Sequence, residues 1–228
     1  MGIQLALVCV AGGRGARFGG DKLAERVAGR SIVEHSLAAL RRAYATAPLV
    51  VVVPFHRIES WRELLAAGFP DAELVAGGDR RQDSVRAGVA RAVAGGADVV
   101  AVHDAARPAV DPEDVKWVVK ALGSAGGAVL CGVVEDAVKR VDGSGLVLET
   151  MDRGELRLAQ TPQVFRAAAL ARAWEMVDFS RTWTDEAAML ESLGVPVRSV
   201  VAQRPNPKLT TVDDLRLIRM MLEGHVIP

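Results

Sequence analysis

The sequence predicts an α/β fold with a mainly parallel, doubly wound sheet and one projecting β-hairpin arm. Three observations predict it: apolar runs of strand length, helix start signals between these runs, and one late segment with the pattern of a hairpin. Strands that are apolar at nearly every position are typical of sheets buried on both faces. Their alternation with helices favours the doubly wound arrangement.

The apolar runs and the capping signals place the main elements. The predicted strands are Leu5–Val10, Leu49–Val53, Glu73–Val75, Val99–Val102, Ala128–Val134 and Val197–Val201. Helix starts are indicated by a Ser or Thr with an acid three residues later, and by an Asp before a Pro. These pairs are Ser31 with Glu34, Asp111 with Pro112, and Thr211 with Asp214. The helices that they open are expected to reach Leu40, Leu122 and Leu222.

Residues 137–151 break the alternation of strands and helices. Asp142-Gly-Ser-Gly145 has turn composition and is flanked by two short, moderately apolar runs, which is the pattern of a β-hairpin. The flanks hold few residues able to build a core, so we expect the hairpin to project and to need a partner surface. The prediction is one domain over residues 1–228, with an arm at about 137–151.

The composition is that of an ordinary globular protein. Half of the 228 residues are hydrophobic, and 28 acidic residues balance 28 basic ones. This balance argues against a nucleic-acid partner and favours a small anionic ligand held by a few local cations. Cys9 and Cys131 lie in apolar runs, without a zinc or disulfide pattern. Leu5–Ala11 is too short to span a membrane and lacks a basic leader, so we expect a cytoplasmic protein with no membrane partner.

The loop after the first strand is rich in glycine and arginine. Ligands of open α/β sheets bind at the carboxyl ends of the strands, where this loop, Ala11–Lys22, begins. Its glycines allow backbone N–H groups to approach an anion, and Arg17 and Lys22 add positive charge, which suits a triphosphate. Asp21 and Phe18 occupy positions where a P-loop and a dinucleotide fingerprint require lysine and glycine. The loop therefore predicts a triphosphate site of another kind.

Two further loops carry charged residues after predicted strands. In Gly77–Ser84, Asp83 or Ser84 would cap the following helix, which leaves ligand contact open for Asp79, Arg81 or the other of the two. The loop His103–Pro108 follows a fully apolar strand, where a buried acid and arginine are costly unless paired or used. Asp104 could hold a sugar hydroxyl or Mg²⁺, and Arg107 could pair with it. We expect His103 to be a packed or hydrogen-bonded neighbour and not a catalyst.

A fourth group lies late in the chain and contains Arg153, Thr184–Glu186 and Asn206–Lys208. The simplest interpretation of Thr184 alone is a helix N-cap, with Asp185 and Glu186 in the first turn. Together these residues form a second cluster of cations and hydroxyls that could bind a second phosphate.

Taken in order, these motifs match one known family over nearly the whole chain. The matching pieces are Ala11-Gly-Gly-x-Gly-x-Arg17 with Lys22, Gly77-Gly-Asp-x-Arg-x-Asp-Ser84, Val102-His-Asp-Ala-Ala-Arg-Pro108, Asp152-Arg153, Gln160-Thr-Pro-Gln163, Thr184-Asp-Glu-Ala187 and Asn206-x-Lys-x-Thr210. The sequence resembles the 2-C-methyl-D-erythritol 4-phosphate cytidylyltransferases of the isoprenoid pathway that does not use mevalonate. The glycine loop alone is shared with many sugar-phosphate nucleotidyltransferases, whereas the later motifs are specific in combination.

The resemblance implies a Rossmann-like nucleotidyltransferase with CTP and a polyol phosphate as substrates. It implies that the cytosine and ribose contact Ala11, Gly12, Gly13, Asp79, Ser84 and Ala105, and that the triphosphate contacts Gly15, Arg17 and Lys22. It implies that the acceptor contacts Asp104, Arg107, Arg153, Thr184 and Lys208. The catalytic cations would be Arg17, Lys22, Arg153 and Lys208, and Mg²⁺ would bind mainly through the CTP phosphates, with few or no direct protein ligands. Members of the family are homodimers in which the arm embraces the other subunit.

This sequence departs from the family pattern at three positions. The stretch before Lys22 is shorter and reads Gly-Asp-Lys, Ala137 stands where the arm often has threonine, and Pro207 precedes Lys208. These departures concern the reach of Lys22, one hydroxyl contact to the acceptor, and the local geometry at Lys208.

The expected reaction is in-line attack of the acceptor phosphate on the α-phosphorus of CTP, with release of pyrophosphate. No covalent enzyme intermediate is needed, so catalysis would rest on positioning and charge stabilisation. Two alternatives stay open: a cytidylyltransferase for another polyol phosphate such as ribitol 5-phosphate, and a nucleotide-sugar-binding protein of the same fold. Assays of pyrophosphate release would separate them.

Overall fold

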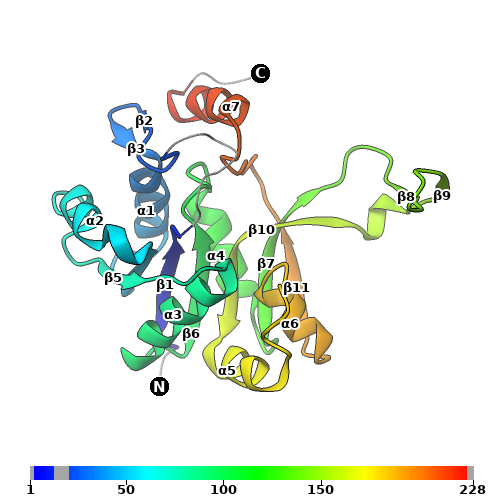
Figure 1. Cartoon of the computed structure of the whole chain (residues 1–228), viewed down its shortest axis with the longest axis horizontal. Helices are drawn as coiled ribbons and strands as arrows, with labels where there is room; N and C mark the ends of the chain where they lie inside the picture. Colours follow the sequence, from blue (N-terminus) through cyan, green and yellow to red (C-terminus); the bar gives the residue numbers. More distant parts are fainter. Residues whose placement is uncertain (1–2, 13–20, 225–228) are drawn as a thin grey trace.

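The computed structural model describes residues 3–12 and 21–224, which form an α/β body and a projecting arm (Figure 1). Within these residues seven strands make one sheet, in the order β11-β7-β10-β6-β1-β4-β5. Their bounds are β1 Leu5–Val10, β4 Leu49–Val53, β5 Glu73–Ala76, β6 Val99–Asp104, β7 Gly127–Val133, β10 Arg157–Arg166 and β11 Val197–Val201. Short pairs of strands lie outside the sheet: β2 Arg26–Val27 with β3 Arg30–Ser31, and β8 Lys139–Val141 with β9 Val147–Thr150.

The predicted fold class is confirmed, with one strand that the sequence did not predict. Neighbouring strands are parallel except where β10 lies antiparallel between β6 and β7. Strand β10 contains Gln160-Thr-Pro-Gln163, and proline lacks the N–H that a strand interior needs, so the segment has the pattern of a loop. The pairing with β7 shifts register between Ala159 and Gln163, which accommodates Pro162. The sheet is therefore mixed but mainly parallel.

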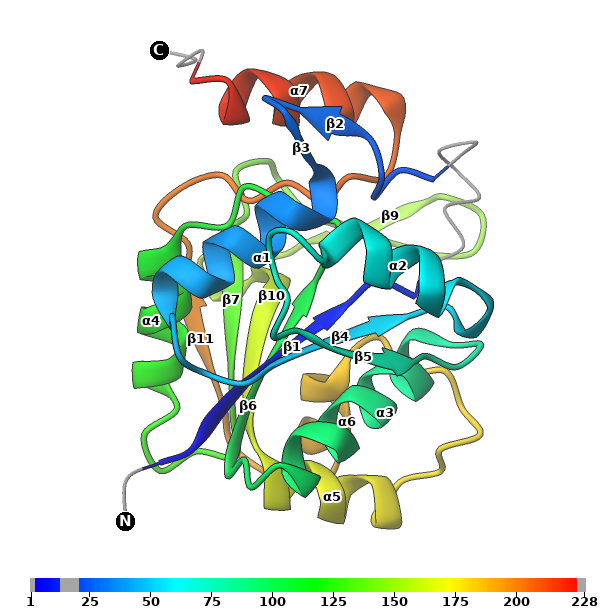
Figure 2. The ribbon, with the colours of Figure 1, turned by 90° about the vertical axis from the view of Figure 1, so that its left-hand side faces the viewer.

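Helices cover both faces of the sheet (Figure 2). They are α1 Ile32–Ala43, α2 Ile58–Leu65, α3 Arg81–Ala94, α4 Pro112–Ala121, α5 Ala167–Met176, α6 Glu186–Ser192 and α7 Val212–Leu222, with short 3₁₀ turns η1 Phe55–Arg57 and η2 Arg153–Glu155. Alternate residues of β1 serve the two layers: Leu7 and Cys9 pack with α1, α2 and α4, whereas Ala6 and Val8 pack with α3, α5 and α6. This alternation is what a strand buried on both faces provides.

The predicted helix starts at Ser31, Asp111 and Thr211 are confirmed. Ser31 and Glu34 form a reciprocal capping box, Asp111 accepts a hydrogen bond from the Glu113 N–H, and Thr211 caps α7. The expected cap of α6 is wrong, and in α3 the expected residue Asp83 acts as the capping-box partner of the N-cap Arg80. Helix α3 begins after Arg80, and Asp83 accepts from the Arg80 N–H at 3.2 Å from inside the first turn, while Ser84 lies deeper in the helix.

Helix α6 begins one residue later than expected, because Asp185 and not Thr184 is its N-cap. The Asp185 carboxylate accepts a hydrogen bond from the Ala188 N–H at 2.9 Å. Asp and Thr both serve as N-caps, and in this helix the N-cap is Asp185. Thr184 is left exposed just outside the helix.

The carboxyl ends of β1, β4, β5 and β6 meet at one edge of the sheet. Val10 lies opposite Asp104 across the β1–β6 pair, and the Ala105 N–H donates to the Val10 carbonyl at 3.0 Å. The close approach of α3 to the sheet helps to fix this edge. A Cβ at Gly88 would lie 2.5 Å from a methyl group of Val52, so only glycine allows this packing. The predicted ligand loops are thus brought side by side.

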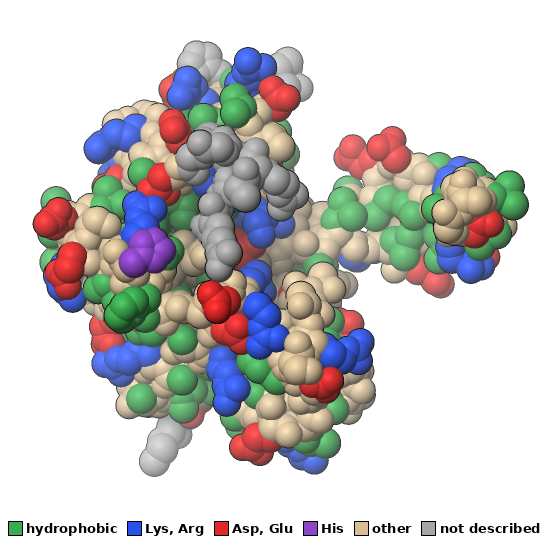
Figure 3. Space-filling view, viewed as in Figure 1, with side chains coloured by type: hydrophobic (Ala, Val, Ile, Leu, Met, Phe, Trp, Pro, Cys, Tyr) green, Lys and Arg blue, Asp and Glu red, His purple; other side chains and the backbone are tan. Residues whose placement is uncertain are grey.

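The hairpin predicted at residues 137–151 is confirmed as β8 and β9, which project from the body (Figure 1). At its tip the Asp142 carboxylate accepts from the N–H groups of Ser144 and Leu146, and Gly145 has a φ of 89°. Hydrophobic side chains cover much of the arm's surface (Figure 3). None of the described helices is both long and apolar enough to cross a membrane.

Candidate active site

A cavity of about 590 Å³ opens at the carboxyl ends of β1, β4 and β5. Its walls come from the loops after the three strands, and its lining residues are Ala11, Gly12, Asp21, Lys22, Leu23, Pro54, Phe55, His56, Arg57, Trp61, Gly77, Gly78 and Asp79. Four predicted nucleotide residues, Ala11, Gly12, Lys22 and Asp79, therefore lie around one space. The predicted residues Gly13, Gly15 and Arg17 lie outside the described residues.

The wall of this cavity near Ser84 leaves no room for side chains on the glycines. A Cβ at Gly12 would lie 3.0 Å from the Ser84 Oγ, and one at Gly77 would lie 2.7 Å from the same atom. Ser84 is buried, and its Oγ lies 3.3 Å from the carbonyl oxygens of Gly78 and Arg80. Gly12 and Gly77 thus allow the Ser84 side chain to pack closely against the two loops that line the cavity.

Lys22 reaches the far side of the cleft although the stretch before it is short. Its Nζ donates to the Leu209 carbonyl at 2.7 Å, across 187 residues of sequence. The preceding residue, Asp21, forms an ion pair with Arg57 at 2.5 Å, which fixes the chain on the other side. Lys22 therefore lies next to the backbone of Lys208, a residue predicted for the second phosphate.

Asp104 is the centre of a network of ion pairs that links α3, β6, α6 and the loop after β11. Its Oδ2 accepts from the Lys208 Nζ at 2.6 Å, and its Oδ1 accepts from the Arg81 Nε at 3.1 Å. Arg81 also donates to the Glu186 Oε2 at 2.8 Å. The Glu186 side chain is only 1% exposed, so the charge of Arg81 is shared between two carboxylates with little access to water. We call these four residues the Asp104 network.

Burial and charge oppose each other in the Asp104 network. Burial raises the pKa of the Asp104 carboxyl, but the nearby charges of Arg81 and Lys208 lower that pKa well below its usual range. Burial likewise raises the pKa of Glu186, and Arg81 only partly offsets the increase. The pKa of Arg81 is raised, because its two carboxylate partners outweigh the burial that would lower it. Asp104 is therefore a fixed negative charge with two fixed positive neighbours.

His103 and Thr161 pack behind Asp104 in the core. The Thr161 Oγ1 accepts from the Asp104 N–H at 3.0 Å and lies 3.2 Å from the His103 Nδ1. Burial lowers the pKa of His103 to about 4. The prediction that His103 is a packed, hydrogen-bonded neighbour is confirmed.

Arg107 does not take the place suggested for it beside Asp104. Its Nη1 donates to the Asn206 carbonyl at 2.6 Å, while Arg81 and Lys208 occupy both carboxylate oxygens of Asp104. Asn206 in turn donates to the Thr161 carbonyl at 2.9 Å. Arg107 and Asn206 thus hold the chain that carries Lys208 against β10.

The other predicted residues lie at different distances from this centre. The Ala105 N–H is bonded to Val10, and its carbonyl accepts from the Ser36 Oγ at 2.8 Å, so its backbone is part of the sheet edge. Thr184 stands between Trp183 and Asp185, whose carboxylate accepts from the Gln163 amide at 2.9 Å. Arg153 lies at the base of the arm, where it donates to the Glu135 carbonyl. Arg153 is therefore joined to the arm and not to the Asp104 network.

Sequence reasoning left the role of Arg81 open and assigned Glu186 only to a helix start. Arg81 lies in a predicted loop with several other charged residues, which indicated a possible role in the site. Glu186 is 105 residues away from Arg81, so local sequence patterns could not show that the two residues pair. A charged residue placed inside an apolar helix face next to Ala187 and Met189 was the available hint, because buried acids are rarely unpaired. On the face shown in Figure 3, basic and acidic side chains gather at the centre of the body.

Comparison with known proteins identifies the family. Residues 5–224 match the family described as 2-C-methyl-D-erythritol 4-phosphate cytidylyltransferase. The chain belongs to this family. It is 40% identical to the cytidylyltransferase of that name from Rhodococcus jostii (strain RHA1), and the match covers 97% of this chain and 96% of the relative. It is 41% identical to the bifunctional enzyme IspD/IspF of Anaeromyxobacter sp. (strain Fw109-5), over 98% of this chain and 58% of that protein.

The fold agrees with a solved structure. The 4-diphosphocytidyl-2C-methyl-D-erythritol synthase from Anaerococcus prevotii DSM 20548 superposes with a TM-score of 0.84, over 97% of this chain and 99% of that one, at 22% identity. As a member of the 2-C-methyl-D-erythritol 4-phosphate cytidylyltransferase family, the chain is an enzyme that transfers CMP from CTP to 2-C-methyl-D-erythritol 4-phosphate in the non-mevalonate pathway. The predicted family, enzyme class and reaction are confirmed.

Proposed function

We propose that the two clusters of the cleft divide the substrates between them. CTP binds in the 590 Å³ cavity, with its base and ribose against Ala11, Gly12, Asp79, Ser84 and Ala105, and 2-C-methyl-D-erythritol 4-phosphate binds beside the Asp104 network. The glycines in the cavity lining, Gly12, Gly77 and Gly78, support the first assignment, because backbone without side chains allows a base edge to approach N–H and carbonyl groups closely. The chain then works as one nucleotidyltransferase domain.

One observation carries this proposal: the Lys22 side chain reaches the backbone next to Lys208, a residue from the opposite end of the sequence. The Lys22 Nζ is bonded to the carbonyl of Leu209, and the Lys208 Nζ is bonded to Asp104. Two polyanionic substrates repel each other, so a transferase needs cations at the place where the two phosphates come together. In the proposed function, Lys22 and Lys208 supply these cations.

The reaction follows from this geometry. An oxygen of the acceptor phosphate forms a bond to the α-phosphorus of CTP, while the bond from that phosphorus to the bridging oxygen breaks and pyrophosphate leaves with the electron pair. Lys22 stabilises the charge on the triphosphate, and Lys208 turns from Asp104 toward the acceptor phosphate. Asp104, which Arg81 continues to neutralise, is then available to accept a hydrogen bond from an acceptor hydroxyl. Catalysis rests on positioning and charge, without a protein nucleophile.

Mg²⁺ fits this site as an ion carried by the CTP phosphates. Both carboxylate oxygens of Asp104 already accept hydrogen bonds from cations, so phosphate oxygens are the better ligands, as is usual for Mg²⁺ at nucleotide sites. Bound there, Mg²⁺ would neutralise charge that develops on the phosphates. In the part of the chain that the structure describes, no group of three or more His, Cys, Asp or Glu residues is placed to hold a metal. The cytoplasm, where CTP is made, is the proposed location.

The arm supports a homodimer. Leu146 at its tip is 64% exposed, and Val147 and Leu148 are 53% and 50% exposed, which is costly for a ribbon that packs on nothing. A second copy of the chain would cover these side chains. Arg153, at the base of the arm, would then contribute to the acceptor site of the other subunit.

A complementation experiment tests both the dimer and the shared site. Two tagged chains, one with Arg153→Ala and one with Lys208→Ala, are co-expressed, and the mixed dimer is isolated through both tags. Pyrophosphate release is measured with CTP and 2-C-methyl-D-erythritol 4-phosphate, and with ribitol 5-phosphate as the comparison acceptor. Each variant alone is expected to be nearly inactive, whereas the mixed dimer regains activity with the erythritol acceptor, because one of its sites has both cations.

The controls separate the possible failures. Dimers in which both chains carry the same substitution keep the low activity of the single variant. If Arg153 serves its own subunit, no site in the mixed dimer is intact and activity does not return. If light scattering shows that the wild-type protein is a monomer, the proposed dimer is wrong. If the enzyme turns over ribitol 5-phosphate but not 2-C-methyl-D-erythritol 4-phosphate, the proposed acceptor is wrong.

A further inference from the structure

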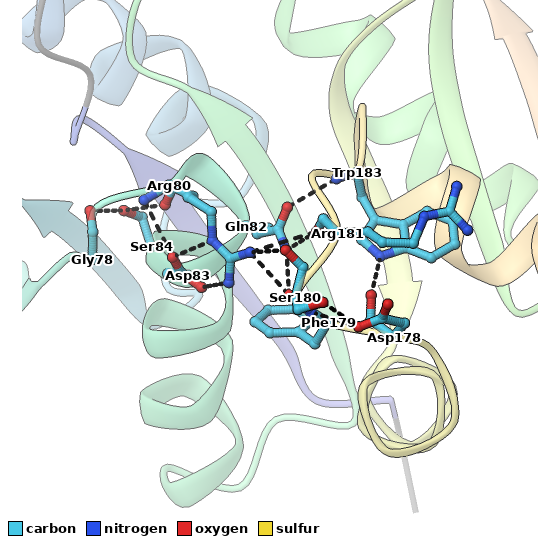
Figure 4. A network of polar contacts seen from close by, with 10 residues as sticks. All are labelled: Gly78, Arg80, Gln82, Asp83, Ser84, Asp178, Phe179, Ser180, Arg181 and Trp183. Carbon is cyan, nitrogen blue, oxygen red and sulfur yellow. Dashed lines mark hydrogen bonds and ion pairs between the residues drawn. The ribbon is translucent and has the colours of Figure 1, made fainter.

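Hydrogen bonds and a cation–π contact join a loop between α5 and α6 to the start of α3, outside the Asp104 network. The loop is Asp178–Trp183, and its partners on α3 and just before it are Arg80 and Gln82 (Figure 4). These residues lie about a hundred positions apart in sequence. The following residue, Thr184, is assigned to the acceptor phosphate in the proposed function.

Gln82 uses both ends of its side-chain amide on this loop. Its Oε1 accepts from the Trp183 N–H at 2.9 Å, and its Nε2 donates to the carbonyls of Arg181 at 2.9 Å and Phe179 at 3.2 Å. Gln82 is 3% exposed, so these hydrogen bonds are shielded from water. A buried amide with all its groups bonded to one loop fixes the position of that loop.

Arg80 holds the same loop from its exposed side. Its Nε and Nη2 form a two-point contact with the Asp83 carboxylate, at 2.8 and 2.7 Å, which sets the plane of the guanidinium. The remaining Nη1 donates to the carbonyls of Phe179 at 2.9 Å and Ser180 at 3.1 Å. The Phe179 ring lies 5.3 Å from the Arg80 guanidinium and 5.1 Å from that of Arg86. The loop is thus bonded and stacked at the same time.

The contacts continue past Thr184 into the active site. Gln82 holds the N–H of Trp183, Gln163 holds the carboxylate of Asp185, and Arg81 holds Glu186. Thr184 lies between residues fixed on both sides, so its backbone position depends on all three contacts. Two of them belong to α3, whose first turn follows the cavity residue Asp79 by only two positions.

We propose that Arg80 and Gln82 are positioning residues for the acceptor phosphate, which act by holding the Asp178–Trp183 loop and thereby Thr184. This inference rests on the proposed role of Thr184. It makes the start of α3 serve both substrates: Asp79, just before the helix, lines the nucleotide cavity, and Arg80 and Gln82 contact the loop. Loosening the loop impairs use of the acceptor and leaves CTP binding intact.

The experiment compares Gln82→Ala, Arg80→Gln and Thr184→Val with Gln203→Ala, a control at an exposed glutamine whose side chain donates to the Val201 carbonyl. Pyrophosphate release gives KM for CTP and for 2-C-methyl-D-erythritol 4-phosphate. Because displacement of a bound group by about 1 Å can cost up to ~100-fold, the acceptor KM is expected to rise about 10- to 100-fold in Gln82→Ala and less in Arg80→Gln. The KM for CTP changes less than twofold, roughly the limit of surface effects, and the control changes neither.

A second measurement follows the loop without reference to activity. The peptide bond after Arg181 is a trypsin site in the middle of the loop, and its cleavage in the native protein is followed by mass spectrometry. Cleavage by a protease reports how often a segment opens, so it is expected to accelerate in Gln82→Ala and Arg80→Gln but not in Thr184→Val or the control. Arg80 is at the surface, so its variant keeps the test available if Gln82→Ala folds poorly.

The outcomes are distinct. If Thr184→Val leaves the acceptor KM unchanged, the acceptor role of Thr184 is wrong, and the positioning role falls with it even where cleavage accelerates. If Thr184→Val raises the acceptor KM but the Gln82 and Arg80 variants do not, the proposed function stands and the positioning role alone is refuted. A rise in both KM values together, or cleavage that stays at the wild-type rate, also refutes it, because either shows that these residues do not act through the loop.

Discussion

The two sides of the cleft use different materials. On the proposed nucleotide side, the backbone of Ala11, Gly12, Gly77 and Gly78 lines the cavity together with side chains that include the cations Lys22 and Arg57. On the acceptor side, Arg81, Asp104, Glu186 and Lys208 form a continuous chain of ion pairs, half of it nearly closed to water. The first side depends on space around glycines, and the second depends on charges fixed in advance.

This difference suits the two ligands. A base and a ribose offer edges and hydroxyls that backbone groups can match, provided that no side chain intervenes. A sugar phosphate carries a compact dianion and several hydroxyls, which cations and a carboxylate already gathered in one place can match. The nucleotide side should therefore be sensitive to added volume and to the loss of Lys22, and the acceptor side to the loss of any charge partner.

The largest effect on turnover is expected for Lys22→Ala. The Lys22 Nζ donates to the Leu209 carbonyl, and the proposed function places Lys22 where the triphosphate and the acceptor phosphate meet. Loss of one preorganised donor at a developing charge typically lowers kcat by roughly 100- to 1,000-fold. Steady-state pyrophosphate release with both substrates at saturation measures it. Lys116→Ala, which removes an exposed lysine paired with Glu113, is the matched control and keeps wild-type turnover.

A near-normal kcat in Lys22→Ala would contradict the proposed role of Lys22 on the nucleotide side. The cation that stabilises the triphosphate would then have to be another residue of the cleft, and the approach of Lys22 to the backbone next to Lys208 would lose its catalytic meaning.

The next effect is on stability, and it belongs to the acceptor side. Arg81→Gln leaves the Glu186 and Asp104 carboxylates, whose side chains are 1% and 10% exposed, without their shared cation. Removing one partner of a buried ion pair commonly costs about 3 kcal/mol in the free energy of unfolding. Urea or thermal denaturation measures the loss. Arg62→Gln breaks a pair with Glu59 that is well exposed on both sides, and it is expected to change stability by no more than about 0.5 kcal/mol.

An Arg81→Gln protein as stable as the wild type would show that the Asp104 network contributes nothing to the fold. The contrast between the two sides would then concern binding alone, and the acceptor KM of the same variant would decide whether even that holds.

Much of this arrangement could be predicted from local sequence, and the failures share one cause. Strands β1, β4 and β11 have the predicted bounds. The continuous apolar runs of β1 and β4 identify buried strands directly, whereas β11 contains the exposed residues Arg198 and Ser199. Strand β10 was missed, since Pro162 and the polar residues beside it resemble a loop until β6 and β7 supply its partners. Its place in the sheet is a tertiary fact that no local pattern contains.

The site shows the same limit. The spacing of motifs was enough to indicate Asp104 and Lys208, but not that Lys208 would pair with Asp104 across 104 residues, nor that Arg81 and not Arg107 would be the second partner. The sequence predicts Thr184 as a helix cap, because threonine commonly is one. In the structure Asp185 is the N-cap, and its other carboxylate oxygen accepts from the Gln163 amide. Local chemistry predicts which residues matter, and the long-range contacts decide what each of them does.

The smallest effect is a pH dependence that should arise behind the acceptor side only. Burial lowers the pKa of His103 from 6.5 to about 4, so the unfolded chain takes up this proton at a higher pH than the folded protein does. The stability that His103 contributes is present above pH 6.5 and is lost as the pH falls toward 4. Between pH 7 and pH 5 the free energy of unfolding is expected to fall by about 2 kcal/mol from this group.

Asp104 keeps its charge through that range, because its pKa lies well below the usual value, so the ion pairs in front of His103 persist while the histidine is forced toward protonation. Denaturation at several pH values, with His103→Gln beside the wild type and His56→Gln as an exposed histidine control, separates this contribution. The slope between pH 7 and pH 5 should flatten in His103→Gln and persist in the control. An equal slope in all three proteins would show that His103 is not the source of the acid sensitivity. The buried packing behind Asp104 would then not distinguish the two sides of the cleft in their pH dependence.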